Sequence, residues 1–63
     1  MFLTEQDAVR IYARFCLAHY RKAARRTADK KAQLLKDKGD VEGHRVWTEV
    51  VQEIEKREGP LPH

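Results

Sequence analysis

The fold is decided by the stretch Leu34-Leu35-Lys36-Asp37-Lys38-Gly39-Asp40-Val41. Gly39 suits the left-handed backbone position that commonly follows a helix. Lys36 and Lys38 carry positive charge where the dipole of the preceding helix favours it. Asp40 can cap a second helix, because its carboxylate can accept hydrogen bonds from the N–H groups of the first turn. We therefore predict a turn at residues 39–40 between two helices.

The helix after this turn has the clearest amphipathic pattern in the chain, and we predict that it runs from Val41 to about Arg57. Its apolar stripe repeats at spacings of three and four: Trp47, Val50, Val51 and Ile54. Trp47 has the largest apolar side chain, so we expect it to anchor the core. Gly59 and Pro60 should end the helix, with residues 59–63 as a short extended tail.

A first helix is predicted from about Glu5 to about His19, with Thr4 as its cap. Its apolar face is expected to consist of Ala8, Ile11, Tyr12, Phe15 and Ala18. Residues 20–38 are also helical in composition, since no Gly or Pro occurs before Gly39.

The phase of the apolar residues separates these two segments. At about 100° per residue, the face of the first helix would continue through polar positions such as Lys22, Arg26 and Lys30. The apolar set of the second segment lies on another side: Ala24, Ala28, Ala32 and Leu35. We therefore predict a break near residues 19–22 and an all-α, three-helix domain over residues 1–63. The alternative is a long helix and a shorter one packed as a dimer.

The candidate core is small for a chain of 63 residues. Its expected members are Val9, Ile11, Tyr12, Phe15, Cys16, Leu34, Leu35, Val46, Trp47, Val50, Val51 and Ile54, with thin contacts from Ala24, Ala28 and Ala32. Area burial at about 25 cal/mol per Å² barely offsets the entropy of ordering such a chain. Apolar residues remain for a subunit interface, notably Phe2, Leu3, Leu17 and Leu61. We predict a homodimer.

Composition excludes several classes of protein. No apolar run approaches the roughly 18 residues of a membrane-spanning helix, and we see no signal peptide. The single cysteine, Cys16, cannot form an intrachain disulfide, which favours a reducing compartment, and we expect a cytoplasmic protein. Serine is absent, so serine hydrolase chemistry is excluded.

Positive charge is concentrated before residue 32. Residues 1–31 hold eight basic and three acidic side chains, whereas residues 32–63 hold five basic and seven acidic ones. The candidate partner-binding or phosphate-binding cluster is Arg21, Lys22, Arg25, Arg26, Lys30 and Lys31. Lys22, Arg26 and Lys30 repeat every four residues and form one ridge. This ridge fits a solvated helix face, an acidic protein partner or the phosphates of a nucleic acid.

No arrangement of residues indicates catalysis or a cofactor. His19, His44 and His63 are too far apart in sequence for a zinc motif, and Cys16 is expected to be a buried, inert thiol. Glu49 and Glu53 share a helix face, but so short a chain can scarcely enclose them in a cleft. We expect no enzyme activity, no metal and no cofactor.

The C-terminal part of the chain carries a spaced set of residues: Ala32, Leu35, Gly39, Asp40, Gly43, Trp47, Val50 and Ile54. With this set it resembles short uncharacterised helical proteins from alphaproteobacteria. Members of that group often carry a Tyr-Gly step near the first inter-helix turn, where this sequence has Tyr20-Arg21. The resemblance implies the unit of two helices joined by Gly39 and Asp40, and it implies no activity.

These observations favour a small, non-catalytic protein–protein interaction or regulatory module. The alternative is a nucleic-acid-associated protein whose basic ridge binds phosphates without reading bases.

Overall fold

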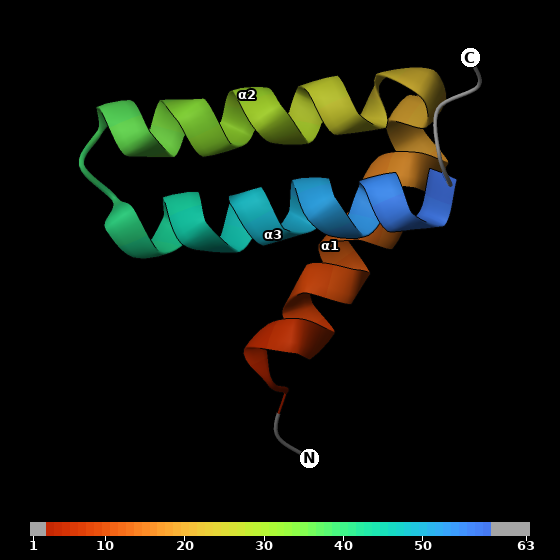
Figure 1. Cartoon of the computed structure of the whole chain (residues 1–63), viewed down its shortest axis with the longest axis horizontal. Helices are drawn as coiled ribbons and strands as arrows, with labels where there is room; N and C mark the ends of the chain where they lie inside the picture. The colour runs from red at the N-terminus through yellow and green to blue at the C-terminus, as the bar shows by residue number, and fades with distance from the viewer. Residues whose placement is uncertain (1–2, 59–63) are drawn as a thin grey trace.

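The computed structural model describes residues 3–58, all of whose regular structure is helical (Figure 1). The elements in chain order are α1 (Glu5–Tyr20), the 3₁₀ helix η1 (Arg21–Ala23), α2 (Ala24–Asp37) and α3 (Val41–Glu58). This confirms the predicted all-α class, with the break at residues 21–23 and the turn at Gly39 and Asp40. The predicted tail at residues 59–63 lies outside the described residues.

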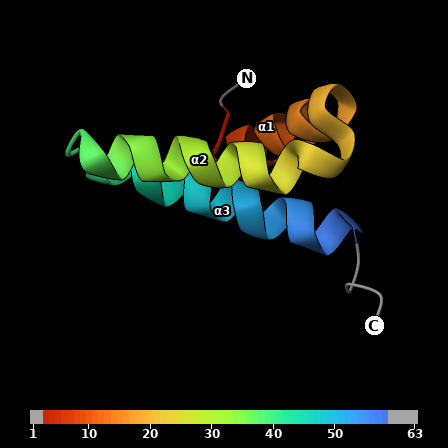
Figure 2. The ribbon, with the colours of Figure 1, turned by 90° about the horizontal axis from the view of Figure 1, so that it is seen from above.

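Helices α2 and α3 lie side by side as an antiparallel hairpin, and α1 crosses them on one face (Figures 1 and 2). Both hairpin helices contact α1. The turn between α2 and α3 projects beyond α1, which crosses nearer the opposite end of the hairpin. The small core therefore lies where all three helices meet.

The start of α1 is fixed by a complete capping box. Thr4 Oγ1 accepts a hydrogen bond from the Asp7 N–H, and the Thr4 N–H donates to Asp7 Oδ2, each at 3.1 Å. Glu or Gln is the usual partner in this motif, but the shorter Asp7 also reaches back to the cap. These bonds hold the pKa of Asp7 below its usual value of 3.8.

The turn between α2 and α3 has the hydrogen bonds of a Schellman motif. Gly39, at φ 83°, donates its N–H to the Lys36 carbonyl at 3.0 Å, and Asp40 donates to the Leu35 carbonyl at 2.9 Å. Asp40 Oδ1 then accepts from the Gly43 N–H at 2.9 Å. A Cβ atom on Gly43 would lie 2.5 Å from Asp40 Oδ2, so glycine at this position makes room for the cap.

The end of α1 carries an unusual backbone conformation. Arg21 has φ 49° and ψ −114°, and its N–H donates to the Leu17 carbonyl. A Cβ atom makes this region costly for every residue except glycine. The chain therefore turns from α1 into η1 at a strained arginine.

The core consists mainly of small side chains. The buried residues are Val9, Ala13, Cys16, Ala24, Ala28, Ala32, Val50 and Ile54. Leu17, Val46, Trp47 and Val51 pack against them and stay partly exposed. Trp47 therefore contacts the core from its edge, while Ile54 and Val50 are the largest completely buried apolar chains.

The predicted core is wrong at four positions, because they are exposed: Ile11 (50%), Tyr12 (42%), Phe15 (52%) and Leu34 (46%). Helix α1 has apolar residues on several sides, and it turns inward the predicted Val9 and Cys16 together with Ala13, which the predicted core lacked. Small side chains on that face let α1 approach the hairpin closely. Leu17, which we had expected at a subunit interface, packs against the core, whereas Leu3 is exposed. Phe2 and Leu61 lie outside the described residues.

We expect Arg21→Gly to raise the free energy of unfolding by about 1 kcal/mol, because glycine adopts the conformation of Arg21 without steric cost. For a domain of this size the midpoint of thermal unfolding should rise by about 4–8 °C. Circular dichroism during heating measures this shift. Lys22→Gly, one residue later within η1, is the matched control and should lower the midpoint. A lower midpoint for Arg21→Gly would contradict the strain.

Candidate interaction surfaces

The largest exposed apolar side chains of α1 lie on the side that faces away from the hairpin. At about 100° per residue, Ile11 and Phe15 lie roughly opposite the buried stripe of Val9, Ala13 and Cys16. Ala8 and Ala18 extend this side by a turn in each direction. We call Ala8, Ile11, Phe15 and Ala18 the outer face of α1. Ile11, Phe15 and Ala18 on this face are exposed, and Ala8 is half-buried.

Aromatic side chains flank the outer face. The rings of Tyr12 and Trp47 stack with centroids 5.2 Å apart and planes at 16°, which joins α1 to α3. The Phe15 ring lies 4.2 Å from the His19 ring. Such amphipathic rings hold fixed positions at a low entropy cost, and they are common where one protein binds another.

The basic cluster lies along η1 and α2, and all six of its side chains are exposed. On the helical wheel, Arg26 and Lys30 lie on the side of α2 opposite the buried Ala24, Ala28 and Ala32. Among residues 3–58, Arg25 is the member of the cluster with an ion pair, to Glu55 Oε2 at 3.9 Å. Arg26 and Lys30 therefore face outward, and Lys22, on the 3₁₀ helix η1, is also exposed.

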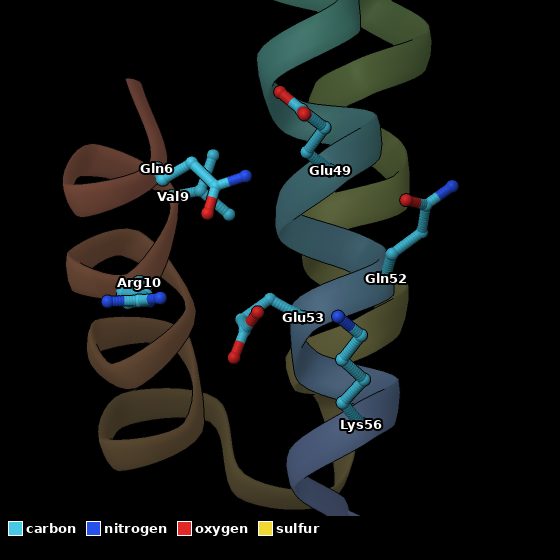
Figure 3. Close-up of a pocket in the computed structure, with 7 residues that line it drawn as sticks. All are labelled: Gln6, Val9, Arg10, Glu49, Gln52, Glu53 and Lys56. Carbon is cyan, nitrogen blue, oxygen red and sulfur yellow. The ribbon is translucent and has the colours of Figure 1, made fainter. Parts of the chain in front are cut away.

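A shallow, open groove separates α1 from α3 (Figure 3). It is lined by Gln6, Val9, Arg10, Glu49, Gln52, Glu53 and Lys56. Gln6 points from α1 toward α3, and Glu53 points from α3 toward α1. Its volume is about 190 Å³, below the roughly 300–1,000 Å³ of pockets that enclose a small molecule. Groups of both charge signs face open solvent here, so the groove offers no water-excluding cleft for catalysis.

Three side chains beside this groove tie α1 to α3. Arg45 Nη1 donates to Glu5 Oε2 at 2.8 Å across 40 residues of sequence. Glu49 also contacts Glu5, and this contact raises the pKa of Glu49 above its usual 4.5, while it and Arg45 lower the pKa of Glu5. Glu49 Oε2 is buried without a hydrogen-bond partner. Arg45 offsets part of the repulsion between the two carboxyl groups through its ion pair with Glu5.

Within the described residues, the Cys16 thiol is buried and the His44 ring bonds to the backbone of another helix. Cys16 is buried, and burial raises the pKa of its thiol, which makes it a poor nucleophile at neutral pH. The His44 ring lies with Nδ1 2.8 Å from the Ala32 carbonyl oxygen, a hydrogen bond that joins α3 to α2. Over residues 3–58, no three His, Cys, Asp or Glu side chains gather in a way that could hold a metal ion.

The basic cluster and Trp47 were found from sequence as candidate sites, and the structure places them apart. Trp47 stacks on Tyr12 of α1, whereas Arg26 and Lys30 point away from the core of the hairpin. Sequence reasoning missed the outer face as a surface, because it assigned Ile11 and Phe15 to the core. It also missed the contact between Glu5, Arg45 and Glu49, whose partners are distant in sequence.

Comparison with known proteins gave no match to a protein-family model, to a curated protein or to a solved structure. Within residues 3–58 no helix is long and apolar enough to cross a membrane. The functional argument therefore rests on the surfaces themselves.

Glu49→Gln should stabilise the fold at pH 7, because it removes one of two facing carboxylates and keeps a group that can donate a hydrogen bond to Glu5. The raised pKa of Glu49 means that its protonated form favours folding below about pH 4.5, and that this benefit is lost as the pH rises through the raised value. The advantage of the variant should therefore shrink between pH 7 and pH 4. The lowered pKa of Glu5 acts in the opposite direction, and its contribution is lost at low pH in both proteins.

Urea unfolding at several pH values measures the difference between Glu49→Gln and the parent protein. Glu42→Gln is the control, because it neutralises an exposed carboxylate in the first turn of α3, where the helix dipole favours negative charge. This control should not be stabilised. An advantage of Glu49→Gln that stays constant from pH 7 to pH 4 would contradict the raised pKa of Glu49.

Proposed function

We propose that the protein is a small, non-catalytic interaction module that forms a homodimer through the outer face of α1. The observation that carries this proposal is the exposure of Ile11 and Phe15, each about half accessible, on the side of α1 opposite the core. Large apolar side chains in one row cost free energy in water, and burial against a protein surface recovers it. We propose no cofactor for this module.

The groove and the thiol of the protein support a non-catalytic role. The groove between α1 and α3 is open and polar, and the Cys16 thiol is buried with a raised pKa. Neither arrangement suits a nucleophile or an acid and base pair. The single buried thiol also agrees with a location in the cytoplasm, which we include in the proposal.

The basic cluster gives such a dimer a second surface, directed at an acidic protein partner. Lys22 on η1 and Arg26 and Lys30 on α2 are all exposed, whereas the outer face lies on α1. Exposed charges of one sign raise the rate at which an oppositely charged partner associates. Contacts of this type weaken as salt concentration rises.

A second candidate function, nucleic-acid binding, rests on the same charges. Three cations at four-residue spacing can neutralise phosphates without reading bases. Binding of labelled duplex DNA and single-stranded RNA, followed by fluorescence anisotropy, separates the candidates. For this function the affinity should fall at least about tenfold between 50 and 200 mM salt and be lost when Lys22, Arg26 and Lys30 are all changed to Glu. An absence of binding at low salt would remove it.

Sedimentation equilibrium tests the dimer. The mass should rise from the 7.4 kDa of the chain toward twice that value as the concentration increases from about 10 µM to about 1 mM. Phe15→Asp should keep the mass at 7.4 kDa throughout, because a carboxylate in the contact would be buried without a partner. Val41→Asp is the matched control: Val41 is also apolar and is 76% exposed, but it lies on α3 outside the outer face.

The control should dimerise like the parent protein. A parent mass of 7.4 kDa at the highest concentration would overturn the proposed dimer.

A further inference from the structure

We infer that the partner on the outer face is a second copy in antiparallel orientation, with Ile11 of each α1 packed on Phe15 of the other. This inference rests on the proposed function and specifies its interface. The interface, which we call the seam, then consists of α1 packed against α1 of the second copy. Each hairpin then lies outside the seam, because the outer face points away from the hairpin of its own chain.

The spacing of the outer face fits a helix pair. Ala8, Ile11, Phe15 and Ala18 are separated by three, four and three residues, which is the alternation of the two core positions in a coiled coil. The row spans about 15 Å at about 1.5 Å per residue. Helix α1 continues beyond it at both ends, from Glu5 to Tyr20, so the whole row is helical.

An antiparallel pairing places large residues on large ones and small residues on small ones. If Ile11 meets Phe15 of the second copy, then Ala8 meets Ala18 of that copy. The two-fold axis then crosses the outer face at the level of residue 13 along the helix. The alanine layers at both ends allow the helices to approach, and the two mixed layers in the middle bury the large side chains. A parallel pairing would place the two Phe15 rings against each other.

Charge decides the orientation. The two ends of α1 differ in charge: Glu5 and Asp7 lie in its first turn, and Arg21 and Lys22 follow its last residue. An antiparallel partner brings the acidic end of each helix to the basic end of the other, and the two helix dipoles also oppose each other. A parallel partner would place like charges together at both ends, which is unfavourable.

The affinity of this dimer should be modest. A standard interface buries roughly 800 Å² on each partner, and a face with two large side chains and two alanines is smaller. Arg14 flanks the same face near the two-fold axis, so its positive charge faces the same charge of the second copy. We expect a dissociation constant on the order of 10–100 µM.

Cysteine cross-linking tests the register. Ala8→Cys and Ala18→Cys are made in separate chains, and each is treated with a short bis-maleimide alone and after mixing the two. In the antiparallel dimer residue 8 lies beside residue 18 of the partner, whereas two copies of residue 8 are separated by about 15 Å along the helix axis. The mixture should therefore give cross-linked dimer, and each variant alone should give little.

The parent protein, whose Cys16 is buried, is the control for reaction at the native thiol. Circular dichroism confirms that both variants keep the helicity of the parent, as expected for substitutions of alanines outside the buried core. Cross-linking of each variant to itself would show a parallel pair and overturn the antiparallel register. A dimer by mass that forms no cross-link in the mixture would overturn the outer face as the seam. A chain that stays monomeric by mass would instead overturn the proposed function.

Discussion

The whole arrangement depends on the close contact of three helices through alanine. Ala13 of α1 and Ala24 and Ala28 of α2 are completely buried where the helices meet. Side chains of this size let the helices approach closely, and the remaining space is filled by Cys16, Val50 and Ile54 in one cluster. Larger side chains on those positions would separate the helices, so the large apolar residues of α1 lie elsewhere.

This packing explains which parts of the fold could be predicted from sequence. The turn at Gly39 and Asp40 follows from local chemistry, because glycine takes a positive φ and aspartate caps the next helix. The break after Tyr20 was found from the change of phase, although Arg21 itself gives no sign of a turn. The stripe of Val50 and Ile54 was found because, with Trp47 and Val51, it repeats at spacings of three and four.

The inward face of α1 was predicted only in part: the expected core held Val9 and Cys16, but it lacked Ala13 and wrongly included Ile11, Tyr12 and Phe15. Val9, Ala13 and Cys16 form one apolar row and Ile11 and Phe15 another, so periodicity alone does not choose between them. Total hydrophobicity favoured the row with the larger side chains, whereas the distance between helices selected the smaller one. The ion pair of Glu5 with Arg45 joins residues 40 positions apart and leaves no local pattern. The exposure of Arg26 and Lys30, in contrast, follows from their position opposite Ala24, Ala28 and Ala32.

The same constraint gives the molecule its surfaces. A core of small residues buries little apolar area, so it stabilises the folded state only a little. It also leaves Ile11 and Phe15 exposed to water. The apolar surface lies on α1, and the positively charged surface lies on η1 and α2. A contact at one surface therefore leaves the other accessible. A dimer would therefore add to the stability of a small chain and present its basic clusters outward.

The central claim is that α1 buries Ala13 and exposes Ile11. The most direct test is urea unfolding of Ala13→Asp and Ile11→Asp at about 1 µM protein, a concentration at which a weak dimer dissociates. Both variants place aspartate in the middle of the same helix, so the propensity cost is matched. We expect Ala13→Asp to lose at least about 3 kcal/mol and Ile11→Asp at most about 1 kcal/mol. A stable Ala13→Asp beside an unfolded Ile11→Asp would contradict the account.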